Sequence, residues 1–416
     1  MKAVSLFACG GIGDLALREL GIKTVVANEL LLDRAEVFKY NHPNVDMVIG
    51  DINEHKNEIV RVSKKHDIDI VFATPPCQGM SKNGRGKLLQ AIRNGKAPKI
   101  DQRNLLIVPT IEIVKELNAD TLLLENVPEM LTTYINDPVE GGYILIIDYI
   151  CRELEGYHLE YRTVNFADYG VAQSRERLIV VVSRRLNILN NVFSSPTHSK
   201  EGSDGKEKWL TLRDVIQDFP KLDAKDERLS KDKDDEYHRV PLLDKDKYFW
   251  VQNTPENKSA FDNQCVQCGF DQNPTHKNKL GKDGINRSSL ETPIRCIRCG
   301  SLLPRPWVVE NGEYRLMKGY TSAYKRMAWD SPSSTITTNF SYACSDNKLH
   351  PEQNRVLSIS EVMAIHTLNA YDFKFKRADG VSVGDTLIRK LIGESIPPKG
   401  LERILVNLKK ELGYFE

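Results

Sequence analysis

The chain has 416 residues, in which 58 lysine and arginine side chains nearly balance 57 aspartate and glutamate side chains. This length allows two or three domains with separate cores, and the charge balance excludes a uniformly basic nucleic-acid coat, so any nucleic-acid surface must be local. No apolar run approaches membrane-spanning length. The N-terminus leads almost directly into an expected strand, without the pattern of a signal peptide.

The first 185 residues alternate short apolar runs with amphipathic segments. The expected strands are 3–8, 24–28, 68–74, 121–124 and 178–183, and the expected helices include 33–41 and 105–117. This alternation predicts a doubly wound, Rossmann-like α/β domain over residues 1–185.

A glycine-containing turn, residues 7–13, joins the first expected strand to a helix beginning near Asp14. The glycines permit close approach of a ligand to the backbone, and the helix offers its N-terminal dipole. Glu29 ends the second expected strand and Asp51 the third region, and a carboxylate at the second strand end can accept hydrogen bonds from ribose hydroxyls. A nucleotide site fits this pattern, and so does a bare structural turn with solvated acids.

Cys77 lies in a turn directly after the strand expected at 68–74, where two prolines, the second being Pro76, restrict the backbone. A cysteine so placed is exposed enough to act as a nucleophile, although a buried structural cysteine is the alternative. Glu125 follows the apolar run 122–124. Partial burial there would raise the pKa of its carboxyl and make it a suitable acid, although a helix-capping role is also open.

Arg175 and Arg177 stand directly before the strand expected at 178–183, and their alternate spacing points both side chains to the same side. Taken alone, the two arginines could be surface charge. Together with Cys77 and Glu125, in this order, they form a constellation with a nucleophile, an acid and cationic support.

The segment between Gln78 and Asn104 is predicted to be a basic, glycine-containing loop. Its cations outnumber its single acid, Asp101, to leave a net charge of +6, and they are Lys82, Arg85, Lys87, Arg93, Lys96, Lys99 and Arg103. A loop of this kind beside a nucleophile suits closure over a phosphate backbone, and a solvated surface loop is the alternative.

Residues 186–325 lose the α/β rhythm and are predicted to be a separate, irregular domain. Two CxxCG sequences within it bring together four cysteines: Cys265, Cys268, Cys296 and Cys299. Four thiolates suit structural zinc in a ribbon over about 261–305, with free thiols or a redox pair as the alternative. The aromatic residues nearby fit either a small core or base contact: Trp307, Tyr314, Tyr320 and Tyr324. From 326 to 416 regular patterning returns, with expected helices at 360–368 and 400–412.

The ordered motifs resemble those of the DNA (cytosine-5) methyltransferases over roughly residues 1–185 and 326–400. They are Phe7-Ala8-Cys9-Gly10-Gly11, Pro75-Pro76-Cys77-Gln78, Asp101-Gln102-Arg103-Asn104, Glu125-Asn126-Val127, Gln173-Ser174-Arg175-Glu176-Arg177, Pro332-Ser333-Ser334-Thr335-Ile336-Thr337 and Pro397. The chain departs from the family in two places. Cys9 stands where the family usually has glycine, and near the C-terminus Gly393-Glu394 precedes Ser395 where the family commonly has Gly-Asn before a small residue.

The resemblance implies a role for each matching position. It makes Cys77 the nucleophile, lets Glu125 contact N3 and the exocyclic amine of cytosine, and lets Arg177, beside Arg175, support O2. It also implies an S-adenosylmethionine site at Phe7, Gly11, Glu29, Asp51, Ile52, Pro76, Leu106 and Ser395. Residues 186–325 match the place of the family's target-recognition domain, and 326–416 would return to the catalytic domain.

The implied function is methylation of C5 in a flipped-out cytosine of a specific duplex DNA sequence, within or related to a restriction-modification system. We accordingly expect a cytoplasmic, nucleoid-associated bacterial or archaeal enzyme, a monomer on DNA, with a cognate endonuclease acting separately. Two alternatives are an RNA (tRNA) cytosine-5 methyltransferase and a catalytically inactive, zinc-dependent DNA-binding regulator. The intact Cys77, Glu125 and Arg177 argue against the inactive regulator.

Overall fold

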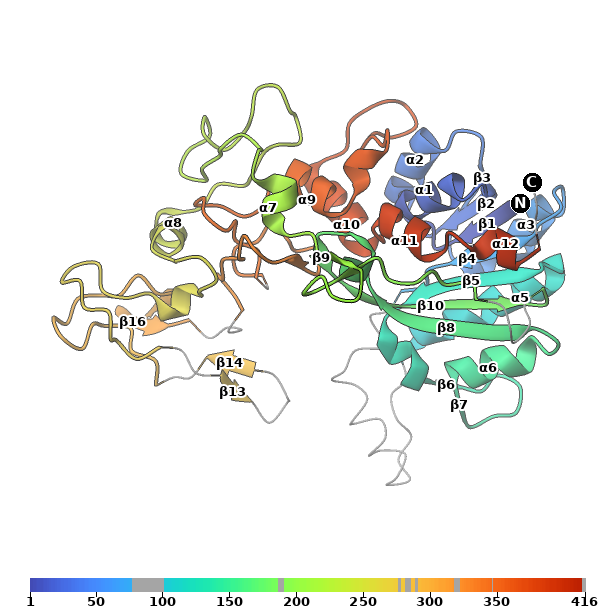
Figure 1. Cartoon of the computed structure of the whole chain (residues 1–416), viewed down its shortest axis with the longest axis horizontal. Helices are drawn as coiled ribbons and strands as arrows, with labels where there is room; N and C mark the ends of the chain where they lie inside the picture. The colour runs from blue at the N-terminus through green and yellow to red at the C-terminus, as the bar shows by residue number, and fades with distance from the viewer. Residues whose placement is uncertain are drawn as a thin grey trace. The chain divides into compact units, whose positions relative to one another are not determined.

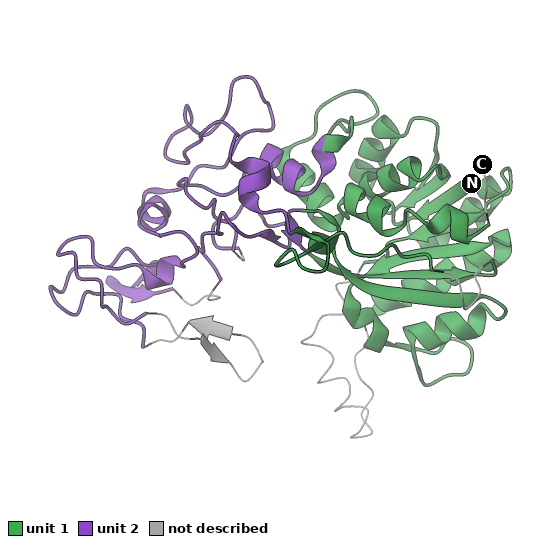
Figure 2. Ribbon diagram, viewed as in Figure 1, with its two compact units in different colours: residues 1–171, 175–208, 370–416 green, residues 172–174, 209–369 purple. Residues whose placement is uncertain are grey.

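The computed structural model describes residues 1–76, 101–185, 191–275, 291–317, 322–345 and 347–413, together with the backbone of 278–280 and 286–288. The chain forms two compact units (Figure 2). Unit 1 comprises residues 1–171, 175–208 and 370–416, and unit 2 comprises residues 172–174 and 209–369. The functional domains that we predicted, with boundaries at 185 and 325, stay predictions. In the division into compact units, which is based on contacts between residues, the segment 326–369 belongs to unit 2.

A seven-stranded sheet with the order β3-β2-β1-β4-β5-β10-β8 forms the centre of unit 1 (Figure 1). Its strands are β1 (Lys2–Leu6), β2 (Lys23–Glu29), β3 (Asp46–Ile49), β4 (Ile70–Ala73), β5 (Thr121–Asn126), β8 (His158–Asn165) and β10 (Glu176–Ser183). The strands β1 to β5 are parallel to one another, whereas β10 is antiparallel to both β5 and β8. All five expected strands are present, which confirms the predicted α/β sheet.

Alternate side chains of the sheet pack into two separate apolar cores, one on each face. Val4 and Leu6 of β1 belong to one core and Ala3 to the other, as the period of two in a strand requires. Helices α5 and α6 cover one face of the sheet and α1 and α11 the other (Figure 1). The helices of unit 1 are α1 (Ile12–Glu19), α2 (Leu32–Asn41), α3 (Ile52–Ser63), α5 (Ile107–Leu117), α6 (Ile146–Glu153), α10 (Asp385–Glu394), α11 (Pro398–Ile404) and α12 (Leu408–Glu411).

The single helix expected over 400–412 is in fact two. Leu405 ends α11 with backbone angles outside the helical range, and α12 begins three residues later. The two helices nevertheless bury the same apolar side, because Leu401, Ile404, Leu405 and Leu408 all join one core. The amphipathic pattern therefore predicted the buried face correctly and missed the break.

Unit 2 is largely irregular, as expected for much of this region, and has its own apolar core. The core centres on Trp250, Phe261, Trp307 and Tyr324. The unit's longer elements are α7 (Leu212–Ile216), α8 (Lys245–Gln252), α9 (Ile359–Ile365), β15 (Trp307–Glu310) and β16 (Glu313–Leu316). The other short strands of the chain are β6 (Tyr134–Asn136), β7 (Tyr143–Leu145), β9 (Gln173–Ser174), β11 (His198–Ser199), β12 (Glu207–Lys208), β13 (Asn278–Leu280), β14 (Asn286–Ser288) and β17 (Ser333–Ser334).

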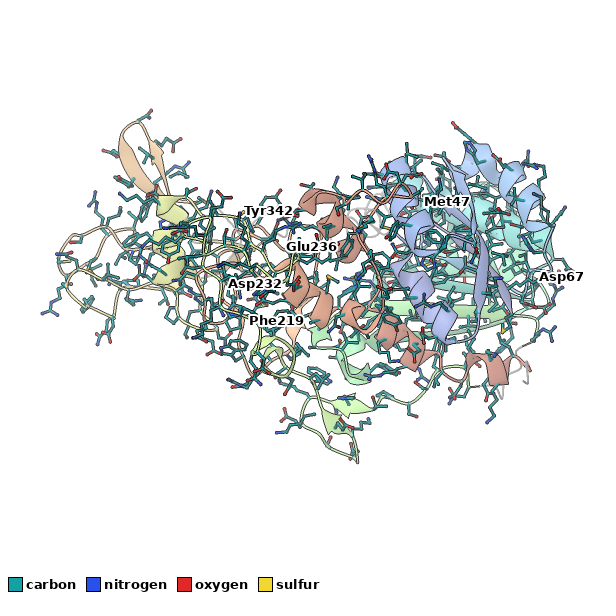
Figure 3. All side chains as sticks on the ribbon, turned by 90° about the horizontal axis from the view of Figure 1, so that it is seen from above. Met47, Asp67, Phe219, Asp232, Glu236 and Tyr342 are labelled. Carbon is teal, nitrogen blue, oxygen red and sulfur yellow. The ribbon has the colours of Figure 1, made fainter. Side chains whose placement is uncertain are left out.

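A fully buried ion pair stabilises the start of α9 in unit 2. The Nη1 and Nη2 atoms of Arg355 each lie 2.7 Å from an oxygen of the Glu361 carboxylate, which also accepts a hydrogen bond from the Ser358 N–H. Burial alone would raise the pKa of Glu361, but Arg355 outweighs it, and the pKa is lowered to about 2. Figure 3 shows the side chains of the described residues and labels Phe219 and Glu236, two other residues of unit 2.

No helix among the described residues has both the length and the apolar character needed to cross a membrane.

Candidate functional site

Three neighbouring parallel strands bring the segments with Phe7, Pro76 and Glu125 to one edge of the sheet. The strands β1, β4 and β5 are adjacent, and they end at Leu6, Ala73 and Asn126. The segments that follow them therefore start side by side, as in other open α/β sheets that bind ligands at this edge. Cys77 and most of the predicted basic loop lie outside the described residues, and Pro76 is the last residue described before them.

The turn after β1 depends on unusual backbone angles. Phe7, Cys9 and Gly11 have φ values of 58°, 48° and 82°. A Cβ atom on Gly11 would lie 2.6 Å from the ring of His42, so only glycine fits there. Cys9 also has a left-handed backbone conformation, but it carries a Cβ atom, so its conformation is strained.

Glu29 holds this turn against the end of β2. Its Oε2 accepts a hydrogen bond from the Cys9 N–H at 2.8 Å, and its Oε1 accepts one from the Leu31 N–H at 3.0 Å. Each carboxylate oxygen keeps a second lone pair, so the side chain can still accept hydrogen bonds from a ribose. Asp51 is the N-cap of α3, where its Oδ1 accepts the Asn53 N–H at 2.8 Å, and Ile52 is buried in the core.

Glu125 and Arg177 form an ion pair at the end of β5. The Nε of Arg177 lies 3.0 Å from Oε1 of Glu125, and the antiparallel pairing of β5 with β10 places the two residues together. Burial raises the pKa of the Glu125 carboxyl, and the nearby Arg177 and Arg175 only partly oppose it. The side chain is therefore suited to hold a proton at a pH where an exposed carboxyl would have lost it.

Arg175 lies close to this pair but has a structural attachment of its own. The side chain is buried, and its Nη2 donates a hydrogen bond to the carbonyl oxygen of Ser395 at 2.8 Å. Ser395 ends α10, and its hydroxyl donates to the Ile392 carbonyl oxygen at 2.9 Å. Two predicted site residues 220 positions apart are thereby joined. Leu106, in contrast, caps α5 and packs against the core of the sheet.

Asn126 positions the proline turn, a role that our reading of the sequence did not give it. Its side-chain amide donates to the carbonyl oxygen of Pro75 at 3.1 Å, and its Oδ1 accepts the Val127 N–H at 2.8 Å. Thr74 adds a second connection, because its hydroxyl donates to the carbonyl oxygen of Phe7 at 3.1 Å. A polar residue that ends a buried strand was the available signal for Asn126.

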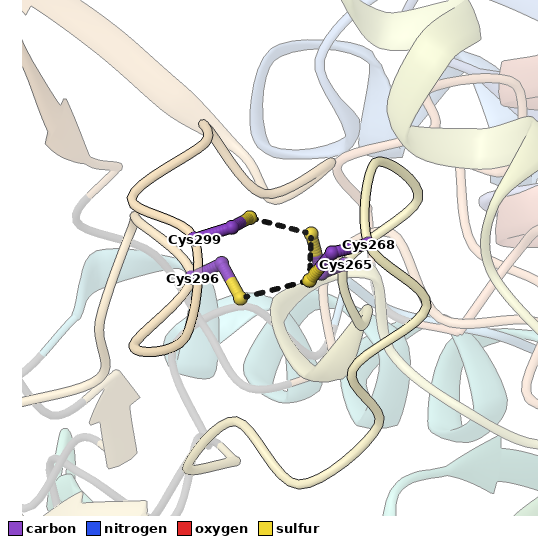
Figure 4. Close-up of side chains that lie close together, drawn as sticks. All are labelled: Cys265, Cys268, Cys296 and Cys299. Atoms are coloured by element: carbon purple, nitrogen blue, oxygen red, sulfur yellow. Dashed lines mark hydrogen bonds between the residues drawn. The ribbon is translucent and has the colours of Figure 1, made fainter.

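The four predicted zinc cysteines converge in unit 2 (Figure 4). Their sulfur atoms all lie within 4.8 Å of one another, and the separations of three pairs are 3.6, 3.6 and 3.8 Å. Bonds of about 2.3 Å to a tetrahedral zinc ion imply sulfur separations of roughly 3.8 Å, whereas a disulfide bond is only about 2.05 Å long. The donor set and its spacing fit zinc, and all four thiols are free.

Buried Arg305 links the segments beside the two cysteine knuckles, a contact that the sequence did not reveal. Its Nε donates to the carbonyl oxygen of Asn263 at 2.8 Å, and its Nη1 donates to that of Pro293 at 2.7 Å. Trp307 and Tyr324 are core residues rather than exposed contacts, whereas Tyr314 is 44% exposed. Tyr320 lies outside the described residues.

Comparisons with known proteins agree with one another. The profile of C-5 cytosine-specific DNA methylases matches residues 1–410. The type II methyltransferase M1.HgaI of Avibacterium volantium is 29% identical over 421 residues, which cover 97% of each chain. M.AgeI of Thalassovita gelatinovora is 24% identical, covering 87% of this chain and 90% of its own. The crystal structure of S. pombe Dnmt2 methyltransferase superposes with a TM-score of 0.55 at 13% identity, with 99% of both chains covered, and so shares the fold.

Proposed function

The chain belongs to the C-5 cytosine-specific DNA methylase family and is a DNA (cytosine-5) methyltransferase. From this premise we propose a catalytic role for each of three residues. Cys77 adds to C6 of a flipped-out cytosine, Glu125 acts at N3 and Arg177 supports O2. The observation that carries the assignment is the mostly buried Glu125–Arg177 pair at the sheet edge. Glu125 lies at the end of β5, which is the neighbour of β4 in the sheet. Pro76 and then Cys77 follow the end of β4 along the chain.

The chemistry explains why these residue types are needed. Cytosine C5 is a poor nucleophile, and addition of a thiolate to C6 makes it enamine-like. A proton held by Glu125 at N3 draws electrons into the ring, and its raised pKa keeps that proton available. After methylation the C5 proton leaves to solvent, and the electron pair of the C5–H bond restores the C5=C6 double bond and expels the Cys77 thiolate from C6. Asn126 positions the turn before Cys77 through Pro75.

The family uses S-adenosylmethionine, which supplies the electrophilic methyl group when bound. We assign its site to the sheet edge around Phe7, Gly11, Glu29, Asp51 and Ile52, and the remaining predicted contacts are Pro76, Leu106 and Ser395. The free lone pairs of Glu29 and the tight glycine turn fit the ribose and a close backbone approach. Leu106 is partly buried against the core of the sheet, and the carbonyl oxygen of Ser395 accepts a hydrogen bond from Arg175.

The cysteine cluster would hold one structural zinc ion through Cys265, Cys268, Cys296 and Cys299. The sulfur spacing supports this assignment, and four thiolates leave no open coordination position for catalysis. We therefore assign the ion a role in folding the ribbon over about 261–305, within a region that recognises the DNA target.

The substrate is double-stranded DNA, and we propose that the enzyme modifies one specific sequence in it. The relatives M1.HgaI and M.AgeI bear the names of type II methyltransferases, which supports a place in a restriction-modification system. On this view the enzyme acts as a monomer on nucleoid DNA in the cytoplasm, and a cognate endonuclease acts separately.

Bisulfite sequencing of DNA from cells that express the chain tests this proposal. We expect 5-methylcytosine at one recurrent sequence, and none in cells that express Cys77→Ser. Parallel assays with purified protein on duplex DNA and on tRNA separate the RNA alternative. Methylation of tRNA alone would overturn the DNA assignment, and an absence of methylation on both substrates would favour the inactive regulator.

A further inference from the structure

The cofactor-binding turn, residues 7–13, lies between two helices of unit 1, α2 and α10, that are far apart in the sequence. On one side is α2, from which the Nε2 atom of His42, the residue that ends the helix, lies 2.9 Å from the carbonyl oxygen of Gly11. On the other side is α10, whose Leu391 would meet a Cβ atom on Gly10 at only 2.8 Å. Both helices therefore pack directly against the turn.

An ion pair links these two helices beside the turn. The Nη1 of Arg34 in α2 lies 2.6 Å from Oε2 of Glu394 in α10, and Nη2 donates to Oε1 at 3.1 Å. Both side chains are mostly covered, with 18% and 29% of their surfaces exposed. The Nε of Arg34 is buried and has no hydrogen-bond partner within the described part of the chain, so this guanidinium has a donor left.

The two charges stand where the helices themselves disfavour them. Arg34 is in the first turn of α2, at the positive end of that helix, and Glu394 is the last residue of α10, at its negative end. Each charge alone would be destabilising at its position, and pairing removes both penalties. The pairing thus stabilises the contact between the two helix ends.

The same pair contacts the turn at the residue that departs from the family pattern. The Sγ of Cys9 lies 3.9 Å from Oε2 of Glu394, and the Cys9 N–H donates to Glu29. The two departures from the family pattern, Cys9 and Glu394, are therefore neighbours in space although they are 385 positions apart. At this contact, a thiol and a paired carboxylate therefore take the place of the small and neutral residues that are usual in the family.

We propose that Arg34 and Glu394 are a positioning pair that clamps α2 to α10 and so holds residues 7–13 in the conformation that binds S-adenosylmethionine. The inference rests on the proposed function of that turn. Neither side chain needs to touch the reacting atoms. The pair instead makes cofactor binding depend on the C-terminal segment.

The test measures S-adenosylmethionine binding by titration calorimetry in Arg34→Gln, Glu394→Gln and the charge swap R34E/E394R. We expect each single variant to bind about fivefold more weakly, the ratio that corresponds to the interaction of a partly exposed ion pair. We expect the swap to recover most of that loss. The KM for the cofactor should rise in the single variants while kcat stays close to the wild-type value.

Two controls separate positioning from general stability. Asp379→Asn breaks an exposed pair with Arg377 in the same C-terminal segment and should leave binding unchanged. Thermal melting identifies a temperature at which every variant is folded, and Arg34→Lys, which keeps the charge, serves if the Gln variant does not fold. Wild-type affinity in both single Gln variants, or a charge swap that binds no better than they do, would overturn the inference alone. A wild-type protein that neither binds the cofactor nor methylates DNA would overturn the proposed function and this inference with it.

Discussion

Cys77 carries the bond-forming step of the proposed chemistry. Cys77→Ser should abolish methyl transfer, because a hydroxyl is a far weaker nucleophile than a thiolate at neutral pH. Cofactor binding, measured by calorimetry, should remain. DNA containing 5-fluorocytosine should form a lasting complex with the wild type only, since fluorine is not eliminated as a proton is. Substantial turnover by the serine variant would remove Cys77 from the mechanism.

Glu125 carries the proton in the same scheme. Glu125→Gln should lower the rate of methylation by about 10²- to 10⁴-fold, which is the usual range for a general acid. Because burial raises the pKa of Glu125, the wild-type carboxyl stays protonated to a higher pH than usual, and the rate should fall as pH rises through that pKa. The glutamine variant should lack this fall. Glu116→Gln, on the partly exposed face of α5, serves as the matched control.

At the scale of elements, α9 depends on a buried ion pair that the sequence did not suggest. Glu361→Gln should destabilise unit 2 by about 3–5 kcal/mol, because Arg355 would be left buried without its partner. Glu227→Gln, which breaks an exposed pair with Lys231, should change the free energy of unfolding by less than about 1 kcal/mol. Urea denaturation followed by tryptophan fluorescence measures both, and equal effects would refute a special role for the buried pair.

The same pair predicts how stability responds to acid. The pKa of Glu361 is lowered from 4.5 to about 2 in the folded protein. A lowered carboxyl pKa contributes stability that is complete above pH 4.5 and is lost as pH falls toward 2. His350 acts in the same direction, because burial lowers its pKa from 6.5 to about 3 and the unfolded chain binds the proton first. Wild-type unit 2 should therefore lose stability below about pH 6.5, and Glu361→Gln should remove the steepest part of that loss.

At the scale of the whole molecule, the two units allow the metal and the chemistry to be separated. Metal analysis should find one zinc ion per chain, and Cys268→Ser should lose it, because four thiolates make the metal part of the folding energy of the ribbon. Cofactor binding should persist, since unit 1 has its own apolar cores. Selective binding to the target DNA, measured against a scrambled duplex, should be lost. A zinc-free variant that methylates the same sites at the wild-type rate would contradict this division of labour.

The order of the motifs and the alternation of apolar segments determined the fold class and the family. They also placed Glu125 and Arg177 in one constellation, which the structure joins at 3.0 Å. Strand β8 was missed because its half-exposed side chains do not form a continuous apolar run, and β3 because it is short and begins with a charge. The spacing of the two CxxCG sequences was sufficient to predict that the four cysteines converge.

Only the tertiary structure decided the contacts between residues far apart in the chain. The hydrogen bond from Arg175 to Ser395 and the ion pair of Arg34 with Glu394 join residues 220 and 360 positions apart, so both depend on which segments meet after folding. A local pattern reports the buried face of an element, because that face repeats with the period of the helix or strand. It does not report the partner of that face, since partners are chosen by packing and charge neutralisation across the whole chain.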